Sequence, residues 1–280
     1  MATLAGAILA LSALQGLAAQ ATDQGFTALS GIALGANPTV LALRGGLDYT
    51  HPLLPQRDGI LWDNARVEVG PRILASPSFA DLGLRVYVEP VAVFDVTLSG
   101  GLRLMTDALG FGQAPVEGYG LRGPSATGSS YKGAFARGWF AAVTPRIKGA
   151  IGPILVTASV GATYHAGETA STGFSEEPVS LQIIDEEDWV FLAASQVLYR
   201  FDSSRLSFVA LGLDYQRTWV AESKGGRAGT RIAAVAVGVV PLADRWELQS
   251  AVFTGGYPTG YPVRTDRPFV LTAFTIKLRL

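Results

Sequence analysis

The sequence contains no cysteine and only two histidines among its 280 residues. The absence of cysteine excludes disulfides, thiolate nucleophiles and cysteine-ligated metal sites. Charged residues make up 16% of the chain, well below the roughly 25% that is usual for soluble proteins. The net charge of −1 gives no overall basic field that would attract nucleic acid. We therefore expect no nucleic-acid partner.

The sequence also lacks a long hydrophobic run, although 49% of its residues are hydrophobic. Beyond the first residues, no stretch approaches the roughly 20 consecutive apolar residues that a membrane helix needs. The longest candidate, residues 232–243, reaches about half of that length. An apolar chain without membrane helices is expected to be either a large soluble β-protein or a transmembrane β-barrel.

The first residues have features of an export signal. Residues 4–14 form a short apolar run, and Ala19-Gln20-Ala21 matches the small-residue pattern that signal peptidase cuts. No Lys or Arg precedes the apolar run, whereas export signals normally carry one. We predict a signal peptide over residues 1–21 and a mature barrel over residues 22–280, exported through the periplasm. The alternative is a buried N-terminal helix.

The mature chain shows repeated alternation with a period of two, which is typical of β-strands. For example, Val96 and Leu98 alternate with Asp95 and Thr97. The pattern predicts about twelve strands, at residues 26–36, 39–50, 65–74, 82–89, 92–105, 138–150, 154–165, 189–201, 206–219, 230–241, 245–256 and 269–280. Because residues 26–36 alternate only weakly, ten strands remain an alternative.

The connections between these strands alternate in length. Short turns are predicted at residues 149–153, 202–205 and 241–244, and long loops at residues 106–137, 166–188, 220–229 and 257–268. Transmembrane barrels have short periplasmic turns and long outer loops, whereas sandwiches do not separate them in this way. The sequence therefore predicts an all-β, antiparallel, up-and-down transmembrane barrel. The connection from residue 50 to residue 64 is longer than a periplasmic turn should be.

Aromatic residues lie near the ends of the predicted strands, as they do in the girdles at membrane interfaces. The predicted interface aromatics are Trp139, Trp189, Trp219, Trp246, Tyr199 and Tyr215.

The C-terminal strand, residues 269–280, carries apolar residues at alternate positions up to Leu280. With this strand, the whole mature chain resembles the bacterial outer-membrane β-barrel proteins of Gram-negative cell envelopes. The resemblance implies that the protein lies in the outer membrane and contacts its lipid. It also implies that residues 269–280 are read by the barrel-assembly machinery. No motif links the chain to a particular functional family.

The two histidines give no catalytic pattern. Outer-membrane phospholipases and lipid A deacylases, as families, place a Ser two residues after a catalytic His. Here Leu53 follows His51 at that spacing, and Gly167 follows His165. The acidic residues 185–188 lack the ligand spacing and glycine turn of a calcium loop. We therefore predict no enzymatic activity, no catalytic residue, no metal and no cofactor.

The strand face opposite the apolar one carries the charged residues, which are expected to line the lumen either as a pore or as internal ion pairs. These residues are Arg44, Asp48, Arg66, Glu68, Arg85, Glu89, Asp95, Arg103, Arg146, Lys148, Arg200, Asp214 and Lys277. The later strands are expected to carry mostly Ala, Gly, Thr and Ser inside, which would leave space.

Two functions are consistent with such a lumen. Arg and Lys rings favour anions in an open pore, so the first hypothesis is a small, porin-like passive channel for ions or small polar solutes with a weak anion preference. Ion pairs can instead fill a narrow barrel. The alternative is therefore a non-conducting structural barrel that anchors an export, adhesion or motility assembly. In that case loops 106–137 and 166–188 would bind envelope proteins.

Overall fold

The computed structural model describes residues 24–36, 40–54, 59, 61–62, 64–77, 79–105, 136–167, 175–176, 182–184, 186–203, 206–221, 228–259 and 268–280. Its long strands are β1 (Gly25–Ala36), β2 (Val40–Pro52), β3 (Arg66–Ser76), β4 (Phe79–Val91), β5 (Phe94–Met105), β6 (Ala136–Ile151), β7 (Ile154–Gly167), β10 (Glu187–Phe201), β11 (Phe208–Val220), β12 (Gly229–Ala243), β13 (Trp246–Thr259) and β14 (Pro268–Arg279). Two short strands, β8 (Ser175–Glu176) and β9 (Ile183–Ile184), form a separate hairpin between β7 and β10.

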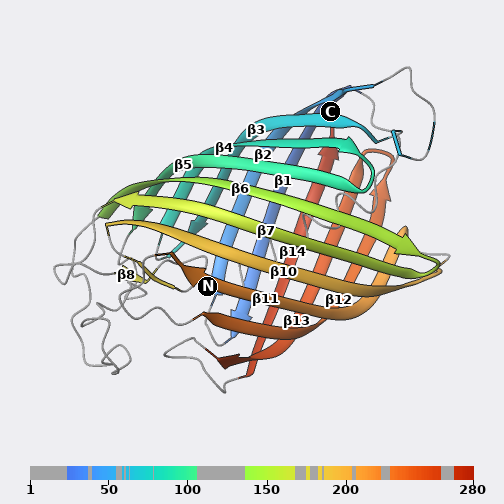
Figure 1. The fold of residues 1–280 in the computed structure, drawn as a ribbon. Coiled ribbons are helices and arrows are strands. Elements are labelled where there is room, and N and C mark those ends of the chain that lie inside the picture. The colour runs from blue at the N-terminus through green and yellow to red at the C-terminus, as the bar shows by residue number, and fades with distance from the viewer. Residues whose placement is uncertain are drawn as a thin grey trace.

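The twelve long strands that the described residues form close into an antiparallel barrel, which confirms the predicted fold. Each strand pairs with its neighbours in the chain, and β1 closes the ring by pairing with β14, with Thr27 opposite Arg279 and Ala36 opposite Val270. The strands run obliquely around the wall (Figure 1). Closure leaves none of the twelve barrel strands with an unpaired edge. In the part of the chain that the structure describes, no helix has both the length and the apolar character needed to cross a membrane.

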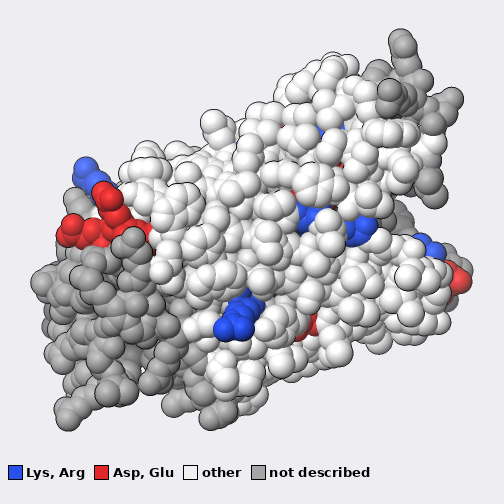
Figure 2. All heavy atoms as spheres, in the orientation of Figure 1, with Lys and Arg blue, Asp and Glu red and all other residues white. Residues whose placement is uncertain are grey.

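The barrel wall is apolar on the outside and charged on the inside across much of its circumference. Leu82, Leu84 and Leu102 point outward and are 61–62% exposed, whereas Asp81 and Arg103 are buried. Figure 2 shows one face on which most described atoms belong to uncharged residues. This is the reverse of a soluble β-protein and is the pattern of a barrel whose outer face contacts lipid.

Connection lengths follow the predicted pattern from β5 onward, but the first strands differ. Residues 37–39 and 77–78 are short connections at the end where long loops were expected, and the connection over residues 53–65 at the other end is long. The described part of that connection makes backbone hydrogen bonds: the Leu53 amide donates to the Ala65 carbonyl at 2.8 Å, and the Ala92 amide donates to the Leu61 carbonyl at 2.8 Å. It therefore packs beside the β4–β5 turn.

Strand β4 begins three residues earlier than its alternation predicted. The Phe79 amide donates to the Ser76 hydroxyl at 3.2 Å, which closes a tight turn after β3 and brings residues 79–81 into the sheet. Asp81 thereby becomes an interior residue of the barrel.

Candidate functional site

A network of buried ion pairs lines the interior of β3 to β6 near the end that holds the C-terminus. Glu89 accepts from Arg66 Nη1 at 2.5 Å and from Lys148 Nζ at 2.7 Å. Lys148 Nζ also lies 3.3 Å from Asp95 Oδ2, which accepts from Arg146 Nη2 at 2.9 Å. Four neighbouring strands supply these five side chains. Because each charge meets an opposite charge, the network is satisfied inside the low-dielectric wall.

The network continues across β2, β3 and β4. Glu68 accepts from Arg66 Nε at 2.8 Å and from Arg85 Nη1 at 3.1 Å. Asp48 forms an ion pair with Arg72 and lies 3.5 Å from Arg85 Nη1. The Arg72 side chain passes close to Gly46, where an added Cβ would come within 2.2 Å of its Nη1, so a larger residue at this position would require Arg72 to move.

Aromatic rings support several of the guanidinium groups. Arg66 and Arg85 lie 5.1 and 5.0 Å from the centre of the Tyr87 ring. The Tyr87 hydroxyl donates to Glu89 at 2.8 Å. Stacking on an aromatic face stabilises a cation without a carboxylate, so Tyr87 contributes both to packing and to the hydrogen bonds of the network.

Two further ion pairs lie apart from the network. Arg103 donates through Nε and Nη2 to both oxygens of Asp81, each at 2.6 Å. On the other side of the barrel, Asp214 accepts from Arg231 Nη2 at 2.5 Å and from Gln196 at 2.8 Å. The bidentate geometry of the first pair fixes the guanidinium plane.

Arg44 on β2 is an exception to this pairing. Among the described residues it forms no ion pair, and its Nη2 donates instead to the Thr275 hydroxyl at 2.5 Å. Its Nε is buried without a hydrogen-bond partner. Gly31 makes room for it, because a Cβ there would lie 3.1 Å from Arg44 Nε and 2.5 Å from the Phe274 carbonyl oxygen.

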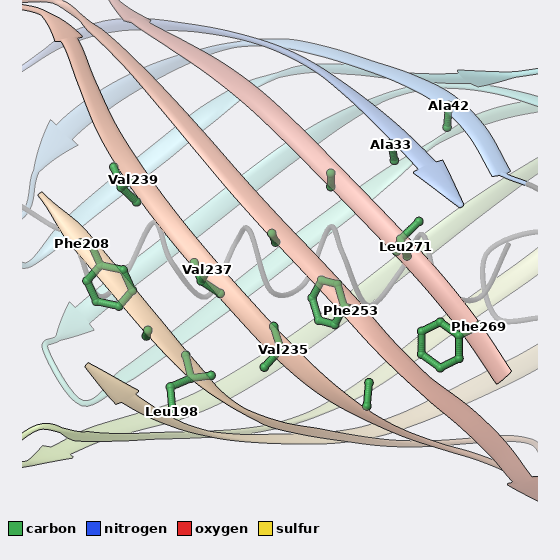
Figure 3. Packing of buried hydrophobic residues seen from close by; sticks show 14 of the residues in the cluster. Ala33, Ala42, Leu198, Phe208, Val235, Val237, Val239, Phe253, Phe269 and Leu271 are labelled. Atoms are coloured by element: carbon green, nitrogen blue, oxygen red, sulfur yellow. The ribbon is translucent and has the colours of Figure 1, made fainter. Parts of the chain in front are cut away.

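The interior of β12 to β14 has a different chemistry. Val235, Val237 and Val239 follow one another along the inner face of β12, beside Phe253 on β13 and Leu271 on β14, and all five are buried (Figure 3). The expectation of small interior residues in the later strands is therefore wrong for β12 to β14. The interior of β6 and β7 does carry small side chains; these are Ala142, Thr144, Thr157, Ser159, Gly161 and Thr163.

A cavity of about 340 Å³ lies inside the barrel. Basic side chains on its wall are Arg44, Arg72, Arg85, Arg103, Arg146 and Arg231. The wall also includes Asp81, Asp95 and Asp214, each of which is paired with an arginine. The cavity therefore borders both the charged network and the small side chains of β6 and β7.

One segment of the connection between β7 and β10 reaches the inner wall. Gln182 donates to the Thr218 hydroxyl at 2.9 Å, and Ile184 clusters with Val190 and Val220. Val190 and Val220 lie near the end of the barrel opposite the C-terminus. Gln182 and Ile184 thus lie against the inner wall at this mouth of the barrel.

Most of the charged residues singled out from the sequence lie on the inner wall, but they do not all meet. The network brings together Asp48, Arg66, Glu68, Arg85, Glu89, Asp95, Arg146 and Lys148. Arg103 and Asp214 lie in the two separate ion pairs, and Arg44 contacts Thr275. Arg200 and Lys277 line a second cavity of about 680 Å³ at the end with the C-terminus. Lys277 is also close enough to Glu68 for the two charges to interact, so it borders the network. Asp81, Arg231 and Gln196 also lie inside the barrel, although the sequence pattern did not predict them.

The predicted interface aromatics lie on the outer surface. Trp139 contacts Tyr164, and Tyr164 contacts Trp189, with ring centres 5.2 Å apart in both pairs. The series continues through Phe191 to Trp219, at 6.4 and 5.6 Å, and spans β6 to β11. Trp246 and Tyr199 are exposed near the other end, and Tyr215 is exposed further inside its strand.

The histidines do not approach one another. His51 is exposed near the end of β2, and His165 is buried near the end of β7 at the opposite mouth. In the described part of the chain, no group of three or more His, Asp or Glu side chains is arranged to hold a metal ion.

A closed antiparallel barrel with an apolar outer surface, a charged interior and aromatic residues on its outer rim is a transmembrane β-barrel of the outer-membrane class. No protein-family model and no curated protein sequence matches the chain.

Several solved outer-membrane barrels are similar in fold. LpxR from Salmonella typhimurium is 9% identical with a TM-score of 0.48, over 89% of this chain and 99% of that one. The COG4313 outer membrane channel from Pseudomonas putida F1 is 8% identical with a TM-score of 0.44, over 92% and 96%. The NanC porin is 10% identical with a TM-score of 0.40, over 91% and 100%. Identities this low assign no function.

Proposed function

We propose that the protein is a narrow passive channel of the bacterial outer membrane, for ions and small polar solutes, with a weak preference for anions. The observation that carries the proposal is the surplus of basic groups inside β2 to β6. Seven described basic side chains there, Arg44, Arg66, Arg72, Arg85, Arg103, Arg146 and Lys148, face five acidic ones, Asp48, Glu68, Asp81, Glu89 and Asp95. A low-dielectric wall strengthens the field of such a surplus.

The surplus is concentrated at Arg44, because the other basic groups have carboxylate partners. Arg44 borders the interior cavity, where its charge can act on a passing solute. Residues 182–184, at the mouth opposite the C-terminus, reduce the opening through which that solute would enter. These two features support a selective channel of small bore over a wide diffusion pore.

Single-channel recording tests the proposal. We expect the refolded barrel in a planar bilayer with a KCl gradient to give small, steady openings and a reversal potential displaced toward the chloride equilibrium. Arg44→Gln should move the reversal potential toward zero, because it removes the unpaired interior charge. The matched control is Arg217→Gln, since Arg217 is exposed on the outer face of β11 and should leave selectivity unchanged.

The outcome that contradicts the proposal is a silent barrel whose mobility on a gel still changes with heating, as a folded barrel's does. That outcome would favour the second candidate, a non-conducting structural barrel. Residues 182–184 against the inner wall and the dense ion-pair network at the other end both support such a closed lumen. Its partners would bind loops 106–137 and 166–188, which lie largely outside the described residues.

The predicted signal peptide, assembly signal and outer-membrane location are also proposals. The signal peptide over residues 1–21 lies outside the described residues. Recognition of residues 269–280 by the barrel-assembly machinery would act on β14, the strand that closes the ring with β1. Residence in the outer membrane is checked by fractionation, in which a soluble periplasmic pool would contradict it.

A further inference from the structure

The carboxylates around the interior cavity are already neutralised by their own partners. Asp81 is held by Arg103, Asp95 by Arg146 and Lys148, and Asp214 by Arg231. Each is thereby unavailable as the main binding group for a cation. The cavity is left with basic groups that have fewer partners.

Arg44 is the least satisfied of these basic groups. It borders the cavity, has Thr275 as its hydrogen-bond acceptor, and keeps a buried Nε without a partner. Arg72 and Arg85, on the next two strands, also border the cavity and share Asp48. A single negative charge placed beside Arg44 would restore the local balance, and guanidinium groups bind planar carboxylates especially well.

Two apolar side chains lie beside the same position, on the strands that flank β2. Leu74 lies opposite Arg44 in the β2–β3 register, and Leu29 lies two residues from Gly31, which faces Arg44 across β1–β2. A simple inorganic ion would leave these surfaces uncovered, whereas an apolar group would cover them and gain the free energy of burial.

We infer that the cavity binds a compact amphiphilic anion, an organic monocarboxylate with one aromatic or short aliphatic group. Arg44 holds the carboxylate, and Leu29 and Leu74 contact the apolar part. The cavity volume of about 340 Å³ suits a molecule of this size. The inference rests on the proposed anion-leaning channel and names the class of solute that the channel would take.

Binding of three small probes tests the inference. Benzoate carries both features, acetate has the charge alone, and benzyl alcohol has the ring alone. In ligand-observed NMR titrations of the refolded barrel, with empty micelles as the blank, we expect benzoate to bind about tenfold more tightly than either of the others. Equal binding of acetate and benzoate would overturn the amphiphilic site, and so would equal binding of benzyl alcohol and benzoate.

Variants assign the two halves of the site. Arg44→Gln should weaken benzoate about tenfold, because it removes a charge-assisted hydrogen bond. Leu29→Thr should weaken benzoate and leave acetate unchanged, because Leu29 lies beside Arg44 on the neighbouring strand. Arg217→Gln, on the outer surface, should change neither. Benzoate binding that is unaffected by Arg44→Gln, in a variant shown to be folded by its heat-dependent gel mobility, would overturn the assignment.

Conductance separates this inference from the proposed function. A conducting barrel that does not bind benzoate would support the proposed channel and overturn the proposed binding site. A silent barrel that binds benzoate through Arg44 would keep the site and remove the passive channel. Failure of both measurements on folded protein would remove both.

Discussion

Two sides of the barrel interior, β2 to β6 and β12 to β14, are filled by different kinds of side chain. On β2 to β6, the inner face carries arginines, a lysine and carboxylates in ion pairs, while the outer face carries exposed leucines. On β12 to β14, the inner face carries valine, phenylalanine and leucine. The outer face of β12 there is built from small residues such as Ala234 and Ala236. The wall is thus amphipathic on β2 to β6 and apolar on both faces over the part of β12 to β14 that holds this cluster. Arg231, Gln249 and Thr275 are buried on the same three strands outside the cluster.

The difference teaches where the interior depends on specific partners. Disrupting a buried ion pair strongly lowers the free energy of unfolding, because removing one member leaves the other charged and unsolvated. An apolar wall depends on area and fit, and its loss on substitution is graded. We therefore expect single substitutions on the charged side to have larger effects than comparable ones on the apolar side.

The largest effect is expected from Glu89→Leu. This change removes the acceptor shared by Arg66, Lys148 and the Tyr87 hydroxyl. Loss of one partner of a buried pair costs about 3–5 kcal/mol. Urea unfolding of the refolded barrel, followed by tryptophan fluorescence, measures the loss.

Glu247→Leu is the matched control for Glu89→Leu. Glu247 is half-buried near the end of the barrel, where it accepts a hydrogen bond from Gln249 at 2.7 Å. Its replacement should cost less than about 1 kcal/mol, as for partly exposed groups. Equal losses of unfolding free energy in the two variants would show that the ion-pair network does not make the charged side more sensitive to substitution.

The next effect concerns the two faces of one strand on the charged side. Leu98 points outward from the middle of β5 and is exposed, whereas Thr97 faces the cavity. An Arg facing lipid at mid-membrane costs roughly 2–4 kcal/mol, so Leu98→Arg should block or slow assembly into vesicles. Thr97→Arg should be tolerated better. If the heat-dependent gel shift shows equal assembly for both, the assignment of the lipid face is wrong.

The sequence predicted the charged side well because polar and apolar residues alternate there. In β5, Asp95 and Thr97 alternate with Val96 and Leu98, and the observed faces follow. In β12 the residues Ala233, Ala234 and Val235 are all apolar, so no period separates the inner face from the outer one. The interior of β12 to β14 was mispredicted for this reason.

The partners of each charge depend on features that alternation does not contain. Lys148 reaches Glu89 across β5, which requires the register of three strands. Asp81 was missed because a tight turn, with Phe79 bonded to Ser76, extends β4 beyond the alternating run. Arg231 stands at the start of the apolar run of β12, where no alternation marks it as internal. The contact of Gln182 with Thr218 joins a loop to a distant strand and has no local signal.

The smallest expected effect tests whether the β12 side is apolar in its energetics as well as its composition. Val237 lies between Ala210 and Ala251 in the sheet, within the buried cluster. Val237→Thr keeps the branched shape and adds a hydroxyl where the neighbouring carbonyls already bond within the sheet, which costs about 1–2 kcal/mol. The reciprocal change, Thr144→Val on β6, faces the cavity and should be close to neutral. Urea unfolding of both variants gives the comparison directly. A larger loss of unfolding free energy for Val237→Thr would establish that the β12 side is apolar and excludes water. Equal stability of the two variants would mean that Val237 faces a hydrated lumen. The two sides would then differ in composition alone.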